Sequence, residues 1–213
     1  MKMNDIASVE IAGDLLWIGY GGATGGGLGQ LDLRSRILSS YMPSLKADPT
    51  ARSGETPPRD EVKQAIAGSD GDLWLLAGGM PRQFHVARGA WETLPKGNCD
   101  WIACLAANAD YLIEGGSVHA KGGLAIENLR DHSWQNLQDA DGIPNPPRAL
   151  TLDGDNLWIG GEGAIAVVDL TANKVKKICR LKTKSIDKIQ IAGGYVWAQF
   201  DWHLYRTPLS ALQ

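Results

Sequence analysis

The sequence is poor in phenylalanine and cysteine and has no large excess of charge of either sign. Phenylalanine occurs twice and cysteine three times among 213 residues, and the formal net charge is −3. A chain this close to neutrality has no field that attracts nucleic acid or an anionic lipid surface, so neither is a predicted partner. No apolar run reaches the length of a signal peptide or a membrane-spanning helix, so no membrane segment is predicted.

The cysteines and histidines do not form a recognisable chemical site. Cys99 and Cys104 are five residues apart on one expected strand, where they point to opposite faces and cannot pair with each other. No metal-ligand spacing occurs among the cysteines or the four histidines, which are His85, His119, His132 and His203. We therefore predict no metal and no cofactor, and the cysteine count leaves the compartment open.

Glycine and tryptophan, in contrast, are abundant, with 26 and 8 residues. This mixture indicates many tight turns and a recurring position for a large flat side chain. Five segments of the chain align on one such position, and the anchor residues are Trp17, Trp74, Ile113, Trp158 and Trp197. Successive anchors are 57, 39, 45 and 39 residues apart, which is the repeat length of four-stranded β-propeller blades.

The residues around each anchor predict a strand pair. The anchors stand in near-continuous apolar runs such as LLWI and LWLL, which are typical of strands covered on both faces. A second column, eight residues before the anchor, is also aliphatic and holds Val9, Ile66, Leu105, Leu150 and Ile189. Asp-Gly or Gly-Asp pairs separate the two columns in several repeats, which is the chemistry of a tight hairpin turn.

Two further strands complete the expected repeat. Third strands are expected at Leu28–Leu33, Phe84–Arg88, Leu124–Leu129, Ile165–Leu170 and Leu204–Leu209. Fourth strands are expected from Trp91, Trp134 and Val175. Each repeat is therefore an antiparallel meander whose strands we call A to D, from the centre of the propeller to its rim. The predicted fold class is all-β, a β-propeller of about five four-stranded blades with the last blade incomplete.

The blades are expected to form one domain over residues 1–213. Their approximate bounds are 6–43, 61–97, 98–142, 144–183 and 184–213. A polar, Pro-rich insertion, Pro43–Arg59, lengthens the connection between the first two blades. The last blade ends after strand C, and only Met1–Ile6 precede the first strand A. Either the ring closes poorly, or the chain is a segment of a longer propeller, or subunits complete one another; we favour the segment, because an open ring would leave adhesive edges.

One repeat resembles a known family closely. Asp141–Asp169, DGIPNPPRALTLDGDNLWIGGEGAIAVVD, follows the two-component regulator propeller repeat nearly position by position. The first repeat is similar with a longer loop, and the other three match at the hydrophobic columns. The resemblance implies a propeller like the extracytoplasmic sensor parts of hybrid histidine kinases, in which the repeats bind ligand and catalyse nothing. This chain contains no kinase, helical linker or membrane segment, and known members carry many more repeats.

A ligand of such a propeller is expected at the top face, formed by the B–C and D–A loops. Glu114 is the most anomalous residue, because its column otherwise holds apolar side chains. If it is partly desolvated, its pKa is raised; if strand B frays into water, the carboxylate is solvated. His119 and Lys121 lie in the B–C loop that follows, where they can recognise a polar ligand or form a solvated loop.

The B–C loop of the last blade contains Asp201, Trp202 and His203. Phe200 and Tyr205 flank it, and aromatic rings beside an acid and an imidazole suit stacking on a sugar or planar ligand. The alternative is that these rings cover a defective terminal blade or a partner surface. Other charged candidates come from the top loops or the top of strand A, namely Arg82, Asp100, Arg148 and Glu162.

Two functions remain open from the sequence. The first is a non-catalytic module that binds or senses a small polar ligand or a protein, with self-association through the incomplete last blade. The second is a propeller enzyme of glycosidase type, which requires two carboxylates facing one another at a suitable separation. The suppliers would be Glu114, Glu162, Asp201 and Asp100. We favour the binding module, because the repeat carries no catalytic motif and propellers host many functions.

Overall fold

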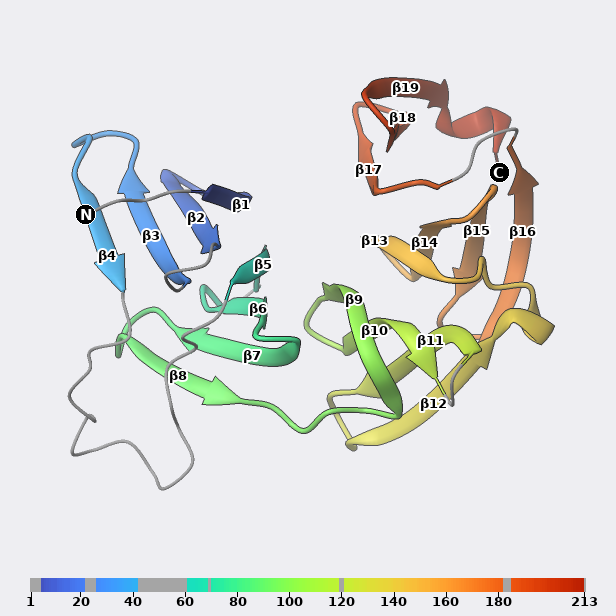
Figure 1. Ribbon diagram of the computed structural model, residues 1–213, viewed down its shortest axis with the longest axis horizontal. Coiled ribbons are helices and arrows are strands. Elements are labelled where there is room, and N and C mark those ends of the chain that lie inside the picture. The colour runs from blue at the N-terminus through green and yellow to red at the C-terminus, as the bar shows by residue number, and fades with distance from the viewer. Residues whose placement is uncertain are drawn as a thin grey trace. The chain divides into compact units, whose positions relative to one another are not determined.

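The computed structural model describes residues 5–21, 26–41, 61–68, 70–118, 121–181 and 185–212. These residues form nineteen β-strands and two short 3-10 helices, so the all-β prediction is confirmed. The strands form five antiparallel sheets, each a meander of consecutive strands (Figure 1). The Pro-rich insertion Pro43–Arg59, His119 and most of the segment Met1–Ile6 lie outside the described residues.

The five sheets are the five predicted blades. Blade one contains β1 (Asp5–Ala12), β2 (Leu15–Gly21), β3 (Gly27–Asp32) and β4 (Leu38–Tyr41). Blade two contains β5 (Val62–Ala67), β6 (Leu73–Ala77), β7 (Met80–His85) and β8 (Ala90–Thr93). Blade three contains β9 (Cys99–Ala107), β10 (Tyr111–Val118), β11 (Lys121–Asn128) and β12 (Ser133–Gln138), followed by the 3-10 helix η1 (Asp139–Asp141).

The last two blades differ in strand number. Blade four contains β13 (Pro147–Asp153), β14 (Asn156–Gly161), β15 (Ala164–Asp169) and β16 (Lys174–Arg180). Blade five contains only β17 (Lys188–Ala192), β18 (Tyr195–Phe200) and β19 (His203–Pro208), followed by the 3-10 helix η2 (Leu209–Ala211). Within the described residues, the last blade thus has three strands, as expected.

One expected strand was displaced. Strand C of blade two was expected at Phe84–Arg88, but β7 spans Met80–His85. The reason is the preceding turn, because Gly78 and Gly79 both have a positive φ, 61° and 72°, and close the β6–β7 hairpin with two residues. The hydrophobic column alone did not show that this hairpin turns so early.

The anchor residues lie on the second strand of every blade, and three are almost completely buried. Trp17 is 1% exposed, Ile113 is 0% exposed and Trp158 is 2% exposed. They belong to apolar clusters that join neighbouring sheets, so the recurring flat or branched side chain fills the space between blades. This is the environment that the near-continuous apolar runs predicted.

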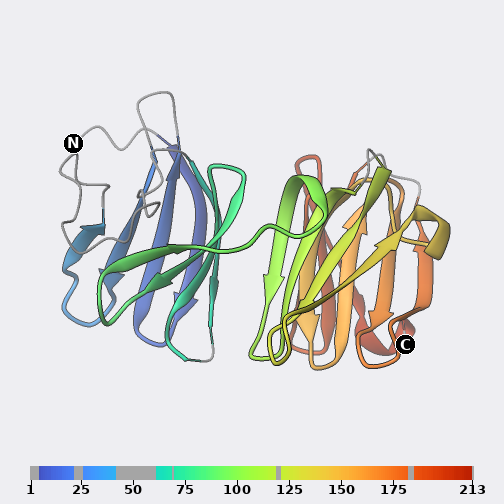
Figure 2. The same ribbon diagram turned by 90° about the horizontal axis from the view of Figure 1, so that it is seen from below.

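The chain divides into two compact units, residues 1–96 and residues 97–213. In the first unit, blades one and two pack through an aromatic cluster in which the Tyr41 and Phe84 ring centroids are 4.8 Å apart. In the second unit, blades three, four and five stack face to face (Figure 2). That the whole chain forms one domain stays a prediction.

A glycine two residues after the anchor permits this stacking. Gly19, Gly115 and Gly160 occupy this column in blades one, three and four. A Cβ at Gly115 would lie 3.1 Å from Leu150 Cδ1, and one at Gly160 would lie 2.6 Å from Ile186 Cγ2. The next sheet therefore approaches the backbone itself, which a larger residue would prevent.

Among the described residues, no helix is long and apolar enough to cross a membrane.

Candidate functional site

Blade five packs one sheet face against blade four. Val196, Ala198 and Phe200 alternate along β18 and therefore share this face. On β19, Thr207 is paired with Val196 and Tyr205 is paired with Ala198, so both residues extend the same face. The face is therefore apolar over β18 and becomes partly polar toward the edge strand.

An open groove of about 470 Å³ lies between this face and the outer strands of blade four. Blade four contributes Ile165 from β15, Cys179 from β16 and Leu181, which follows β16. Leu212, which follows η2, also lines the groove. Its lining is mainly apolar, and its volume lies within the range of small-ligand pockets.

Two aromatic rings form part of the groove wall. Phe200 and Tyr205 stack with ring centroids 4.3 Å apart and planes 4° from parallel. The β18–β19 turn beside them contains Asp201, which has a φ of 50°, and Trp202, which is 98% exposed. A parallel ring pair beside a fully exposed indole can cover the flat side of a sugar or an aromatic ligand.

The opposite face of blade five is already occupied by its own side chains. The Arg206 guanidinium lies 4.8 Å from the centroid of the Tyr195 ring and 5.5 Å from that of the Trp197 ring. The Trp197 indole N–H donates to the carbonyl of Ala192 at 3.2 Å. These contacts hold the aromatic side chains in place, and Arg206 also contributes to the lining of the groove.

The predicted residues of the last B–C loop lie beside the groove and are not among the residues that line it. Asp201, Trp202 and His203 are exposed in and after the β18–β19 turn, next to the stacked Phe200 and Tyr205. The sequence interpretation named the turn, but it did not show that the flanking rings stack or that they line a groove. Whether these residues bind a ligand stays a prediction.

Glu114 lies elsewhere and is enclosed. Its side chain is 0% exposed in β10, so the alternative in which the end of strand B frays into water is wrong. Glu114 Oε1 accepts a hydrogen bond of 3.0 Å from the backbone N–H of Gly97, which lies before β9. The carboxylate thus ties the segment leading into blade three to the interior of that blade.

Lys121 does not join Glu114. Lys121 is the first residue of β11, is exposed, and is paired with Val118 at the end of β10. Glu114 is four residues earlier in β10, a separation of about 13 Å along a strand. His119 lies outside the described residues, so the predicted group of three is not assembled around the carboxylate.

The remaining predicted residues occupy separate positions. Arg82 in β7 donates from Nη1 to Thr93 Oγ1 at 2.9 Å, so it stabilises the outer strands of blade two. Asp100 in β9, Arg148 in β13 and Glu162 in the β14–β15 turn are exposed. Of the four proposed carboxylates, one is therefore enclosed, and the other three belong to three different blades.

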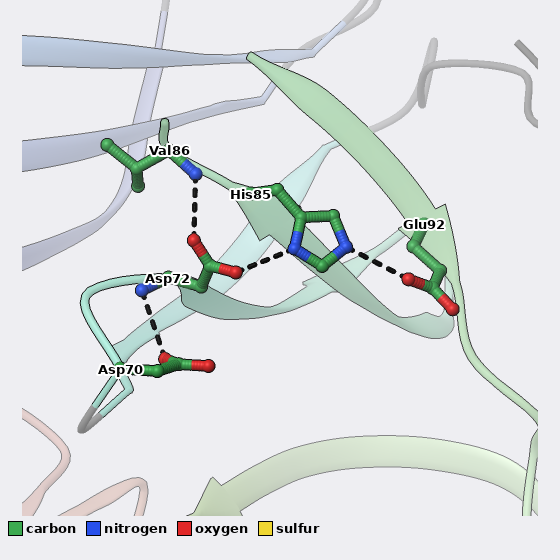
Figure 3. Close-up of polar contacts among 5 residues, drawn as sticks. All are labelled: Asp70, Asp72, His85, Val86 and Glu92. Atoms are coloured by element: carbon green, nitrogen blue, oxygen red, sulfur yellow. Dashed lines mark hydrogen bonds and ion pairs between the residues drawn. The ribbon is translucent and has the colours of Figure 1, made fainter. Parts of the chain in front are cut away.

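A polar cluster that the sequence analysis missed lies in blade two (Figure 3). His85 Nδ1 is 2.6 Å from Asp72 Oδ2, and His85 Nε2 is 2.9 Å from Glu92 Oε2. The second oxygen of Asp72 accepts the backbone N–H of Val86 at 3.0 Å, and the Asp72 N–H donates to Asp70 at 3.1 Å. The imidazole at the end of strand C therefore bridges one carboxylate that directly precedes strand B and another on strand D.

The two carboxylates change the ionisation of His85. Partial burial lowers its pKa, but the hydrogen bonds to Glu92 and Asp72 outweigh burial, and the pKa is raised from its ordinary value. The side chain of His85 is 15% exposed and that of Asp72 is 20% exposed. The cluster thus favours a protonated imidazole held between two acids.

In three other blades, the side chain of the last residue of strand C caps the turn that follows. In blade two, this cluster provides the cap. The last residue of strand C is Asp32, Asn128 or Asp169 in blades one, three and four, and each side chain accepts backbone N–H groups of the following turn. His85 occupies this column in blade two, and its side chain has no oxygen to accept these N–H groups. Asp72 on the neighbouring strand accepts the turn N–H instead, so the arrangement is first a structural cap.

The signal for this cluster was present in the sequence. At the last position of strand C, blade two has a histidine, whereas blades one, three and four have an aspartate or an asparagine and blade five has Pro208. Recognising it required strand C of blade two to be placed correctly, which the hydrophobic pattern did not do. Within the described ranges, no group of three histidine, cysteine or acidic side chains is arranged to hold a metal ion.

Comparison with known proteins supports the fold assignment. No family model and no curated protein matches the chain. Among solved structures, the extracellular domain of the putative hybrid two-component system BT3049 from B. thetaiotaomicron aligns with a TM-score of 0.71 and 17% identity. The alignment covers 98% of this chain and 28% of that one.

Two other solved structures are similar. The extracellular domain of BT4673 from B. thetaiotaomicron has a TM-score of 0.64 at 16% identity, over 95% of this chain and 27% of that chain. A chain of the mitotic checkpoint complex has a TM-score of 0.68 at 14% identity, over 98% and 61%. The chain thus spans about a quarter of the two bacterial domains. The resemblance to two-component regulator propellers is confirmed at the level of the fold.

Proposed function

We propose that this chain is a non-catalytic binding and sensing module, and that its blade-five groove receives the flat apolar part of a ligand. The observation that carries the proposal is the groove of about 470 Å³ beside the stacked rings of Phe200 and Tyr205. A groove of this volume with a mainly apolar lining is typical of sites that bind small molecules.

The chemistry of the lining favours recognition over catalysis. Ile165, Val196 and Ala198 supply apolar surface, while the hydroxyls of Tyr205 and Thr207 can each donate or accept a hydrogen bond. Such a surface suits a ring with one polar edge, as in a sugar or a planar aromatic group. No carboxylate and no histidine is among the residues that line the groove, so its described wall supplies no acid–base pair.

The comparison gives the sensing part of the proposal. The two bacterial neighbours are extracellular domains of putative two-component or one-component systems. If this chain shares their role as well as their fold, ligand occupancy of the groove is the event that is sensed. A full account of signalling would involve the rest of such a system.

Cys179 provides a direct test, because it is a half-buried thiol in the groove wall. Cys99 and Cys104 are only 2% and 3% exposed, and burial raises the pKa of the Cys104 thiol. Native-state alkylation with iodoacetamide, followed by mass spectrometry, should therefore modify Cys179 selectively. Indole serves as the planar probe and methyl β-glucoside as the sugar probe.

A bound ring should slow alkylation of Cys179 in a saturable manner. Phe200→Ala should abolish this protection, because it removes half of the ring stack. Leu204→Ser is the matched control, since Leu204 is an exposed residue of β19 that does not line the groove. An alkylation rate that neither probe changes at any concentration would refute the proposed site.

A further inference from the structure

A second cavity, of about 180 Å³, lies between blades three and four. Blade three contributes side chains from β10, β11 and β12, and blade four contributes the turn between β15 and β16. The cavity is at the strand ends that meet the A–B and C–D turns, opposite the B–C loops where the sequence analysis expected a ligand. The anchor of blade three is Ile113 where the other four blades have tryptophan, so a smaller side chain enters the space between these two sheets.

The strand register of blade three gathers polar side chains at this cavity. Tyr111 is paired with Asn128, and Asn128 is paired with Ser133, so these residues form one row across β10, β11 and β12. Ile126 and Gln135 form the neighbouring row on the same face, because side chains two residues apart on a strand point the same way. A sheet face covered by another blade is expected to be apolar, but this one ends in four polar side chains.

The cavity has an apolar floor and a polar rim. Ile126 of blade three and Leu170 of blade four are only 4% and 7% exposed. Ser133, Gln135 and Thr171 are exposed around them. A ligand with C–H groups on one side and hydrogen-bonding groups at its edge therefore matches both parts of the wall.

Two of the rim side chains are held in place by the chain itself. Asn128 Oδ1 accepts the backbone N–H of Arg130 at 2.9 Å, which leaves the amino group of the carboxamide as the donor toward a ligand. The Thr171 hydroxyl donates to Asp169 Oδ1 at 2.6 Å, so its oxygen remains an acceptor. Asp32 and Asp169 stand at the column of Asn128 in blades one and four, and only blade three has a carboxamide there.

The wall favours a neutral ligand, because none of the described residues that line the cavity carries a charge. A charged ligand would lose hydration there without meeting an opposite charge in the wall. Carboxamides and hydroxyls both donate and accept hydrogen bonds, as the hydroxyl groups of a polyol do. The cavity of about 180 Å³ corresponds to about six water molecules at about 30 Å³ each, so a molecule with one six-membered ring can replace them.

We propose that this cavity binds a small neutral polyol. The hydroxyl groups of the polyol replace the hydrogen bonds that water makes with the rim, and its C–H groups lie on Ile126 and Leu170. The site is distinct from the groove of blade five, so the inference goes beyond the proposed function and does not depend on it.

A matched pair of probes tests the proposal: myo-inositol, a neutral ring polyol, and cyclohexanol, a ring of the same size with one hydroxyl. In ¹H–¹⁵N NMR spectra, myo-inositol should shift the side-chain amide signals of Asn128, Gln135 and Asn173 saturably, with a Kd on the order of 1 mM. The side-chain amide of Asn136, which is exposed on the other face of β12, should not shift. Cyclohexanol should shift none of these signals at the same concentrations.

Variants that keep the turns intact locate the binding. Asn128→Asp retains the oxygen that caps the turn but replaces the donor with a charged acceptor, so it should weaken myo-inositol binding by about tenfold or more. Asn173→Gly removes a rim carboxamide and is compatible with the φ of 49° at this position, and it should also weaken binding. Asn136→Asp, the same change away from the cavity, should leave the affinity unchanged. Far-UV circular dichroism and thermal unfolding check folding, and Asn173→Gly serves alone if Asn128→Asp does not fold.

The inference fails on any of three results. The first is the absence of a shift in the three amide signals at myo-inositol concentrations up to about 100 mM. The second is an equal response to cyclohexanol, which would assign binding to the apolar floor alone. The third is slower alkylation of Cys179 without a shift in the three signals, which would place the polyol in the groove of blade five.

Discussion

Blade four and blade five carry the same sequence columns in different surroundings. The anchor Trp158 is buried between two sheets, whereas the equivalent Trp197 is partly exposed and packs against Arg206. Strand C of blade four, β15, is buried along nearly its whole length, and strand C of blade five, β19, is exposed along nearly its whole length. A side chain at a given repeat position is therefore buried only where a neighbouring sheet covers it, and its own hydrophobicity is not sufficient.

Blades four and five also have different residues at two equivalent positions. Two residues after the anchor, blade four has Gly160 below the side chain of Ile186, whereas blade five has Gln199. At the end of strand C, blade four has Asp169 and blade five has Pro208. The two blades thus differ in sequence at positions that, in blade four, contact the next blade or cap the turn into the fourth strand. Four predictions test this comparison, from the largest effect to the smallest.

The largest effect is expected at the anchor. Trp158→Ala should lower the free energy of unfolding by about 3–5 kcal/mol, because it empties a packed space between blades. Trp197→Ala should cost about 1 kcal/mol, since it loses a partly exposed stack on Arg206. Urea unfolding of the two variants measures the difference, and equal losses would contradict the comparison.

Trp158→Phe is the control for the chemistry of the anchor. The Trp158 indole Nε1 is buried and has no hydrogen-bond acceptor among the described residues. Phenylalanine fills most of the space without this unpaired donor, so Trp158→Phe should cost much less than Trp158→Ala.

The second prediction exchanges the residues that follow the anchor. Gly160→Gln should destabilise the chain by about 1–3 kcal/mol, because the new side chain must displace the buried Ile186. The reciprocal change, Gln199→Gly, should alter stability by roughly 0.5–1 kcal/mol through backbone entropy alone. Thermal unfolding distinguishes the two, and a Gly160→Gln variant as stable as the native chain would show that blade five can move away freely.

The third prediction concerns the last residue of strand C in blade two. The pKa of His85 is raised, because its hydrogen bonds to Glu92 and Asp72 outweigh the effect of burial. Its contribution to stability is complete below its ordinary pKa of 6.5 and is lost as pH rises through the higher pKa of the folded state. His85→Asn restores the side chain used in blade three and removes this dependence.

Urea unfolding between pH 5 and pH 9 provides the measurement. The native chain should lose about 1 kcal/mol more than His85→Asn over this range, a modest value because Glu92 is half exposed. Asp72→Asn serves as the comparison that keeps the turn acceptor and removes one charge. A pH dependence identical in the native chain and His85→Asn would assign it to other groups.

The smallest effect is expected at Asp169, the counterpart of Pro208. Hydrogen bonds from the Thr171 hydroxyl, Lys176 and the Ala172 N–H hold the Asp169 pKa well below its ordinary value of 3.8. Its contribution is present above that value and is lost as pH falls through the lower pKa of the folded state. Asp169→Asn keeps an acceptor for the turn but carries no charge.

The native chain should therefore lose slightly more stability than Asp169→Asn between pH 5 and pH 2, as thermal unfolding at each pH can measure. Asp169→Ala, which also removes the acceptor, should be the less stable of the two variants at neutral pH. An Ala variant as stable as the Asn variant would show that the cap does not stabilise the turn into β16.

Much of the fold could be predicted from the sequence, because the information is local and repeated. The anchor column, its aliphatic companions and the hairpin turns recur five times, so errors in single strands did not affect the architecture. Strand C of blade two was misplaced because its early turn depends on the backbone of Gly78 and Gly79 and not on hydrophobicity. The burial of Glu114 could not be predicted, since it depends on which side of blade three the preceding segment crosses.

The candidate site was predictable only in part. Asp201, Trp202 and His203 were singled out as a loop, but the groove beside them is formed by side chains from two blades. Ile165 and Cys179 line the same groove as the ring pair only because of how blades four and five stack. The cluster around His85 likewise joins residues from three strands, and spacing along the chain does not reveal it.

The all-β class and the number of blades could be predicted from the sequence alone. These properties follow from periodicity and turn residues, which act over short distances along the chain. Only the tertiary structure decided where the open groove lies, which carboxylate is enclosed and which imidazole is held between two acids. Those properties depend on the neighbours that each side chain meets across sheets and strands, and hydrophobic patterning does not specify such neighbours.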